Sequence, residues 1–357
     1  MLIKQIELIN FRNYKNINFV PNEKLNIITG PNGIGKTNLV EGIYYTNLAK
    51  GFRNKKDEEL IKEGENEFII SCSIENGVQN HKLNFYFNSK KNGKKIYLDG
   101  KAIKKLSELN KITNILLFTP SMGELFKNSP QERRDYFDIC LSKISDKYFE
   151  NLKNYKKLVK SRNLALKSEN VDRNLIKSID KQLVPISKTI VSLRSVYVQR
   201  LNSIISSISE QISNKSKRLE IIYSPILPIN QEFENKLFNL YQEKLEKDIV
   251  LQNTSVGIHK ENYFMEIEGK DISVFGSQAE NRLSVVALIL SGYFVSKDET
   301  NRPVVILDDV FSELDAENRE KLIEFTKKLS QVFITATETE QIEFEKKITE
   351  AKQWKKM

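Results

Sequence analysis

The chain has 357 residues, which is too long for one ordinary domain and favours about two. Its hydrophobic residues make up 39% of the chain, so a core can form, but no stretch of about 18 apolar residues predicts a transmembrane helix. The net charge is +9, and with only Cys72, Cys140 and two histidines no zinc site is expected and a reducing cytoplasm fits.

The first 120 residues predict several strands around one glycine-rich loop. Apolar residues indicate strands at 2–9, 17–19 and 25–29, and helical spacing predicts a helix at 38–44. Residues 68–74 and 81–87 predict antiparallel strands, and Asn92-Gly93 and Asp99-Gly100 predict hairpin turns. A further buried strand is expected at 115–118.

The glycine-rich loop from Gly30 to Thr37 fits the P-loop pattern G-x-x-x-x-G-K-[ST] between a strand and a helix. Such a loop presents backbone N–H groups to phosphate oxygens, and the helix that follows adds a favourable dipole. We expect Lys36 to neutralise the β- and γ-phosphates of ATP and Thr37 to offer its hydroxyl to Mg²⁺. The candidate nucleotide-binding residues are Gly30, Asn32, Gly33, Gly35, Lys36, Thr37 and Asn38. A chance glycine-rich turn is the alternative, and the full pattern in this context argues against it.

Residues 131–218 differ in character, since they contain one proline and no glycine. Apolar residues from Ile176 to Tyr197 follow a heptad rhythm, which predicts a short antiparallel helical arm. Pro185 would kink a helix there or mark a break between two. An ordinary helical subdomain with one amphipathic face explains the same pattern.

The basic residues are concentrated in this helical segment. Residues 151–218 hold fifteen Lys and Arg against four Asp and Glu, a net of +11. A basic segment of this kind predicts contacts with nucleic-acid phosphates, although a solvated helix face is the alternative.

The remaining residues return to α/β character. Predicted elements are a strand at 220–223, helices at 231–250, 277–295 and 316–330, and strands at 304–307 and 332–335. The apolar run at 304–307 ends in Asp308 and Asp309, as a Walker B strand does. Asp308 is expected to hold Mg²⁺ and Asp309 to orient or deprotonate the attacking water, unless both merely cap a buried strand at a sheet edge.

The P-loop lies near the start of the sequence and the two carboxylates lie near its end. The fold class predicted is therefore α/β: a P-loop ATPase head with an inserted, mostly helical lid or arm domain. The expected domains are the two head halves, 1–130 and 251–357, and the helical arm, 131–250. The distance between the halves argues against a compact small-molecule kinase.

Several motifs together resemble the RecF family, bacterial recombination mediators related to SMC-type ATPases. They are Asn10-Phe-Arg-Asn-Tyr14, the P-loop, Asn128-Ser-Pro130 with Arg133, Arg134, Phe137 and Asp138, Gly276-Ser277-Gln278 with Arg282, and Leu307 to Asp315. They occur in the family's order over nearly the whole length. The chain departs from the family pattern at Ala279-Glu280-Asn281, at Gly257 to Asn262, and at Ser121-Met122.

The resemblance implies an ABC/SMC-type head in which ATP is sandwiched between the P-loop of one subunit and the signature helix of another. Ser277 would then act catalytically on ATP held by the partner, and Gln278 would bind that nucleotide, whereas a simple helix N-cap is the alternative for Ser277. Asp315 would bridge the dimer, and Thr335 or Thr337 would sense the γ-phosphate. Arg12 would either reach the nucleotide phosphates or pair with acids at the surface.

The function implied is ATP-dependent DNA binding in recombinational DNA repair and replication, by a weak ATPase. ATP would close a homodimer of heads as a clamp or loader on DNA without sequence specificity, and hydrolysis would open it. The expected phosphate contacts come from the basic segment 151–218 and from Lys50, Arg53, Lys55 and Lys56. Other recombination mediator proteins are expected partners, no membrane is, and the expected location is cytoplasmic. The alternative is an ATP-binding adaptor with negligible turnover that recruits partner repair proteins, which the altered signature favours.

Overall fold

The computed structural model describes residues 1–53, 56–91, 93–214, 217–295 and 302–337. Asn92 of the predicted turn, the basic residue Lys55 and the charged tail 352–357 lie outside the described residues. The chain forms two compact units: Met1–Gly123, Ser207–Ser216 and Gln278–Met357 in the first, Glu124–Ser206 and Lys217–Ser277 in the second. Residues 124–130 and 251–277, expected in the head, therefore belong to the second unit, and residues 207–214, expected in the arm, belong to the first.

The first unit contains two sheets. The six-stranded sheet has the order β2-β1-β4-β5-β6-β7, and its neighbours pair antiparallel. Its strands are β1 (Leu2–Phe11), β2 (Tyr14–Phe19), β4 (Glu67–Asn76), β5 (Gln79–Asn88), β6 (Gly93–Leu98) and β7 (Lys101–Ala102). The four-stranded sheet has the order β3-β13-β12-β8, and all its pairs are parallel. Its strands are β3 (Leu25–Thr29), β8 (Ile115–Phe118), β12 (Val304–Leu307) and β13 (Gln331–Ala336).

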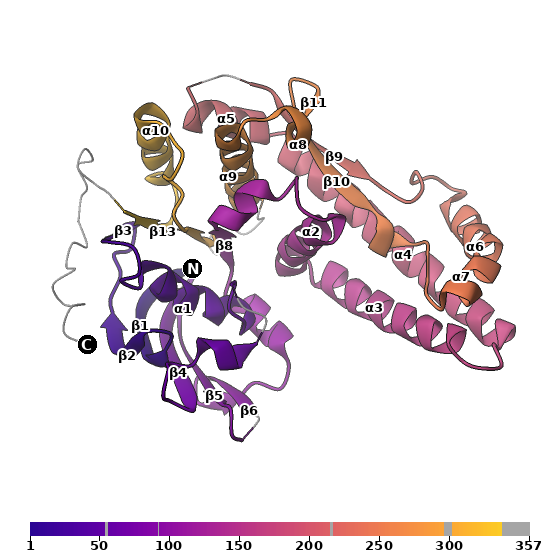
Figure 1. The fold of residues 1–357 in the computed structure, drawn as a ribbon, viewed down its shortest axis with the longest axis horizontal. Coiled ribbons are helices and arrows are strands. Elements are labelled where there is room, and N and C mark those ends of the chain that lie inside the picture. Colours follow the sequence, from indigo (N-terminus) through magenta and orange to yellow (C-terminus); the bar gives the residue numbers. More distant parts are fainter. Residues whose placement is uncertain (54–55, 92, 215–216, 296–301, 338–357) are drawn as a thin grey trace. The chain divides into compact units, whose positions relative to one another are not determined.

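Helices lie on both sides of the parallel sheet, with α9 and α10 on one side and α1 on the other (Figure 1). The helices here are α1 (Lys36–Leu48), α9 (Gln278–Val295), α10 (Ala316–Thr326) and the short turns η1 (Asp57–Leu60), η2 (Leu106–Lys111) and η3 (Pro120–Glu124). Helix α5 (Ile205–Ile212) begins in the second unit and ends in the first.

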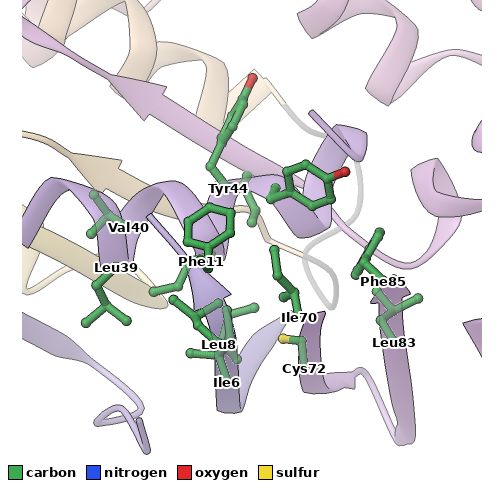
Figure 2. Packing of buried hydrophobic residues seen from close by; sticks show 14 of the residues in the cluster. Ile6, Leu8, Phe11, Leu39, Val40, Tyr44, Ile70, Cys72, Leu83 and Phe85 are labelled. Atoms are coloured by element: carbon green, nitrogen blue, oxygen red, sulfur yellow. The ribbon is translucent and has the colours of Figure 1, made fainter. Parts of the chain in front are cut away.

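One hydrophobic core joins the two sheets through α1. Leu39 and Val40 of α1 pack with Leu8 of β1, and the same cluster includes Ile306 and Phe333 of the parallel sheet. Figure 2 shows residues of β1, α1, β4 and β5 in this cluster. A Cβ atom on Gly42 would lie 2.7 Å from Leu8 Cδ2, so any larger residue at position 42 would displace the Leu8 side chain from its place between α1 and β1.

A buried glutamine also connects the sheets. The Ile3 N–H donates to Gln331 Oε1 over 2.7 Å, and Gln331 Nε2 donates to the Ile3 carbonyl over 3.0 Å. These bonds satisfy both halves of a fully buried amide. These two hydrogen bonds hold β13 against β1 and so help to position the carboxyl end of β13.

The second unit is mostly helical, with one small antiparallel sheet of order β11-β10-β9. Its helices are α2 (Pro130–Ile144), α3 (Asp146–Leu166), α4 (Arg173–Asn202), α6 (Phe233–Glu243), α7 (Leu245–Leu251), α8 (Ile272–Phe275) and η4 (Ile258–Lys260). Its strands are β9 (Leu219–Ser224), β10 (Asn262–Ile267) and β11 (Lys270–Asp271). Helices α3 and α4 run side by side along this unit (Figure 1).

Two sequence predictions for this unit need correction. A break at Pro185 is wrong, because α4 continues through it; burial of Leu183, Val184 and Ile190 outweighs the one lost backbone hydrogen bond. The single helix predicted at 231–250 is two helices, α6 and α7, which meet at Lys244. Within the described residues, no helix is both long enough and apolar enough to cross a membrane.

Candidate nucleotide site

The predicted ATPase residues meet at one edge of the parallel sheet. The P-loop follows β3, the two Walker B carboxylates follow β12, and Thr335 lies near the end of β13, between those two strands in the sheet order. The register pairs Leu307 with Ile334 and Ile28 with Thr335, so these carboxyl ends are level. The edge outside the carboxyl ends of parallel strands is where α/β folds bind ligands.

Asp308 is the centre of a small hydrogen-bond network. The hydroxyl of Thr37 donates to Asp308 Oδ1 over 3.0 Å, and the hydroxyl of Thr335 donates to the same oxygen over 2.7 Å. Burial raises the pKa of Asp308, because the charged carboxylate loses water, and the two hydroxyl donors lower it only in part. A buried carboxylate beside a threonine hydroxyl offers the oxygen ligands that Mg²⁺ prefers, so these residues fit that ion.

Thr335 also positions Asp309, which the sequence did not indicate. Its hydroxyl oxygen accepts a hydrogen bond from the Asp309 backbone N–H over 2.8 Å. Asp309 has φ 49°, a left-handed conformation that is unfavourable for a residue with a side chain. Thr335 therefore links the two Walker B carboxylates and holds the second one in a strained conformation, whereas Thr337 is exposed.

Lys36 lies over the P-loop backbone. Its ammonium donates to the carbonyls of Gly30 and Pro31, at 2.6 and 2.9 Å, and only 8% of the residue is exposed. Burial lowers the pKa of Lys36, and the charges of Asp309 and Asp308 oppose this shift. The lysine has no direct carboxylate partner among the described residues, so its charge is available for an anion held by the loop.

The P-loop conformation depends on glycine and on two residues where β1 turns into β2, Asn13 and Tyr14. Gly33 and Gly35 have φ 82° and 116°, which favour glycine. A Cβ atom on Gly35 would lie 2.7 Å from Tyr14 Oη, and the Tyr14 hydroxyl donates to the Gly35 carbonyl over 2.9 Å. Asn13 Nδ2 donates to the Ile34 carbonyl over 3.1 Å and its Oδ1 accepts from Asn38 Nδ2 over 2.7 Å. Asn32 and Gly33 are exposed at the outer end of the loop.

Arg12 pairs with a buried acid rather than an acid at the surface. Its guanidinium donates to both oxygens of Glu41, over 2.9 and 3.2 Å, and to the Glu59 carbonyl. Arg53 donates to the same carboxylate over 2.6 Å. Burial alone raises the pKa of Glu41, but the hydrogen bonds from Arg12 and Arg53 outweigh it, so that pKa lies below its ordinary value. No motif or spacing in the sequence indicates Glu41, which looks like an ordinary polar position of α1.

The predicted signature segment lies at the start of α9. Ser277 immediately precedes the helix and Gln278 begins it, and both residues are exposed. Further along α9, Arg282 donates to the Ser312 carbonyl and lies 5.6 Å from the centre of the Phe118 ring. Arg282 thus connects the signature helix to the loop that follows Walker B. Asp315, at the end of that loop, caps α10 by accepting from the Asn318 backbone N–H over 2.8 Å.

A family model described as the RecF/RecN/SMC N-terminal domain matches residues 2–357. The DNA replication and repair protein RecF of Clostridium acetobutylicum is 34% identical over 340 residues, covering 94% of this chain and 93% of that protein. The RecF of Lachnoclostridium phytofermentans is 33% identical over 328 residues, covering 91% and 89%. The chain belongs to the RecF family.

Solved structures confirm the fold of this RecF-family chain. A structure described as the recombination mediator protein RecF with ATP in the RecFOR pathway has TM-score 0.86 and 32% identity, covering 96% of this chain and 93% of that one. An SMC head bound to the C-terminal winged-helix domain of ScpA has TM-score 0.59 at 15% identity, which shows the shared head fold alone. The predicted RecF resemblance and the SMC-type head are therefore confirmed, and the chain is a member of a family of DNA replication and repair proteins.

The basic segment 151–218 of this RecF-family chain divides into buried and exposed cations. Arg162 is fully buried and pairs with Asp180 over 2.7 Å and Asp248 over 2.6 Å. Arg194 is buried as well and pairs with two carboxylates of the second unit. Burial costs such charges their hydration, so these two arginines hold the unit together and cannot contact DNA.

Other cations of the segment are exposed. Six of them pair with no carboxylate among the described residues: Lys157, Lys160, Lys167, Lys177, Lys181 and Arg200. We call four of these the arm lysines: Lys157 and Lys160 of α3, Lys177 and Lys181 of α4. The prediction that the whole segment contacts phosphates therefore applies to a smaller set of residues than the net charge suggests.

Proposed function

We propose that this chain is an ATP-dependent DNA-binding protein of recombinational repair and replication, in which ATP closes a homodimer of heads and hydrolysis opens it. The observation that carries the proposal is the arrangement of Thr37, Asp308 and Thr335 beside the P-loop, with an exposed signature residue on the same chain. The solved relative described with ATP supports the nucleotide, and the names of the curated relatives support the repair role.

The P-loop residues bind and orient the nucleotide in this proposal. The N–H groups from Gly30 to Gly35 and the start of α1 hold phosphate oxygens, and Lys36 turns from the loop carbonyls to neutralise them. Thr37 and Asp308 hold Mg²⁺, which supplies positive charge at the transferring phosphate. Asp309, fixed by Thr335, orients the attacking water. Hydrolysis is weak and serves as a switch.

The signature segment acts in trans. Ser277 is exposed and immediately precedes α9, so a second copy can bring its bound ATP to the start of that helix. Closure then places Gln278 beside that nucleotide and Asp315 across the dimer. Asp315 already caps α10, so any contact with a partner would use a carboxylate that is held in place.

DNA is bound by its phosphates, through the arm lysines and through Lys56 after α1, whereas Arg53 is held by the buried Glu41. These contacts carry no sequence information. Because the proposed ligand is DNA, the proposed location is the bacterial cytoplasm. The proposed partners are other recombination mediator proteins. The competing proposal is an adaptor that binds ATP without turnover, favoured by Ala279 and Glu280, which stand where the family has glycine and glutamine in its signature.

The test is Ser277→Arg, with Ser178→Arg as the control, because Ser178 is an exposed serine of α4 that belongs to none of the predicted ATP motifs. The Ser277 variant should bind ATP but show no ATP-dependent dimer by light scattering and little phosphate release. Mixing it with Lys36→Ala protein should restore one composite site per heterodimer. Normal dimerisation and hydrolysis by Ser277→Arg would refute the trans arrangement, and a parental protein without turnover, with or without duplex DNA, would establish the adaptor.

A further inference from the structure

We propose that the solvent-facing side of β4, β5 and β6 binds single-stranded DNA, with unpaired bases stacking on Tyr86 and Tyr97. The proposal rests on the DNA binding proposed above and adds a second surface to it, within the first unit and separate from the arm lysines. We call this surface the tyrosine face and define it by Ile69, Asn84, Tyr86, Asn88, Lys95 and Tyr97.

The alternation of β5 creates this face. Leu83, Phe85 and Phe87 are buried in the core, so the residues between them lie on the opposite side of the sheet. Tyr86 faces Lys95 of β6, and Asn84 faces Tyr97. The two tyrosines are therefore diagonal neighbours, and their rings meet edge to face with centroids 5.7 Å apart. Tyr86 is 40% exposed, so its ring is open to solvent.

The face is hollowed. A depression of about 660 Å³ is lined by residues of the three strands, including both tyrosines and the amides of Asn84 and Asn88. This volume lies within the roughly 300–1,000 Å³ that small-molecule sites occupy, so a nucleobase fits. Asn88 donates to Glu67 over 2.7 Å, which fixes its amide at the rim. Amide groups beside an aromatic ring provide the donors and acceptors that base edges use.

The charge of the surrounding hairpin fits a polyanion. Residues 79–105 contain eight lysines and one acid, Asp99, so the formal sum is 8 − 1 = +7. Lys94 is neutralised by Asp57 over 2.6 Å. Lys91 and Lys95 line the depression, are exposed and pair with no carboxylate in the described part of the chain. These lysines lie outside the basic segment 151–218.

The combination of rings and lysines favours a single strand over a duplex. In a duplex the faces of the bases are covered by their neighbours, so only the phosphates would contact this surface. An unpaired strand offers both features, and successive bases stack on aromatic side chains while a basic groove follows the backbone. An acidic protein segment could pair with the lysines but would leave the exposed tyrosine ring without a stacking partner, so it fits this surface less well.

The test uses the full chain and a fluorescently labelled oligothymidylate, with binding followed by anisotropy. Tyr86→Ala and Tyr97→Ala should each weaken binding about 10-fold, whereas Tyr86→Phe and Tyr97→Phe should retain it, because phenylalanine keeps the stacking surface. A Lys91→Gln, Lys95→Gln double variant should lower the salt slope by about 1.4, at about 0.7 per single-strand phosphate contact. Binding of a labelled duplex in the presence of ATP should remain at the parental level in every variant.

Several results would overturn the proposal. They are unchanged oligothymidylate affinity in both alanine variants, loss of duplex affinity by the same factor, or a parental protein that does not bind the oligonucleotide. Polyglutamate that competes as well as unlabelled oligothymidylate would show a purely electrostatic surface. Photocrosslinking of a bromodeoxyuridine strand gives a second readout that needs no variant, and crosslinks confined to other residues would also refute the site. Failure of the proposed function would be a different result: the parental protein would not bind duplex DNA in the presence of ATP. That measurement does not use the tyrosine variants.

Discussion

Replacing Thr335 with valine should separate nucleotide binding from hydrolysis. Valine has nearly the same shape as threonine but loses the hydroxyl, which donates to Asp308 over 2.7 Å and accepts from the Asp309 N–H over 2.8 Å. Thr335 is 1% exposed, so water cannot replace the lost partner. The P-loop contacts are untouched, and ATP affinity should stay close to the parental value.

The structure gives the size of the effect. A hydrogen bond to a carboxylate is worth about 1.5–3 kcal/mol, and a buried N–H left without a partner costs about 1–3 kcal/mol. The total is about 2.5–6 kcal/mol, and part of it holds Asp309 in its left-handed conformation. If only about 1.4 kcal/mol of this reaches the transition state, hydrolysis slows tenfold.

The assay is steady-state phosphate release, together with calorimetric measurement of ATP binding. Thr335→Ser keeps the hydroxyl and should hydrolyse ATP at close to the parental rate. Thr337→Val is the matched control on the same segment, because Thr337 is exposed. A valine variant at position 335 that hydrolyses at the parental rate would refute this role of Thr335, as would an equal loss in the serine variant.

Three other changes test the P-loop, the Walker B carboxylate and the arm lysines separately. Lys36→Ala should abolish nucleotide binding or turnover, because the described part of the P-loop has no second cation; parental turnover would contradict its role. Asp308→Asn should raise the thermal unfolding midpoint of the nucleotide-free protein at neutral pH. Burial raises the pKa of Asp308 in the folded state, so its ionised carboxylate destabilises the fold at any pH above the unfolded-state pKa, and asparagine removes that charge. The same variant should lose Mg²⁺-dependent stabilisation by ATP, and a lower midpoint without nucleotide would count against this account. Changing all four arm lysines to glutamine should flatten the salt dependence of duplex binding by up to about 3.6, at about 0.9 per phosphate contact; an unchanged slope would show a solvated face.

Local sequence patterns are sufficient to predict the ATPase head. The glycine pattern from Gly30 to Thr37 and the apolar run before Asp308 are local signals, because a P-loop and a buried strand each need particular residues at fixed spacing. The structure brings these segments together as predicted, and the comparisons confirm the family.

Local patterns do not reveal which polar residues serve the nucleotide site and which stabilise the fold, because that depends on packing. Thr335, Glu41 and Arg162 look like ordinary polar positions in the sequence, yet each is buried among partners that are distant along the chain. Burial removes water, and the free energy of a charge or hydroxyl then depends on the few groups that replace it. That set of groups is fixed by packing, so neither periodicity nor net charge could reveal it.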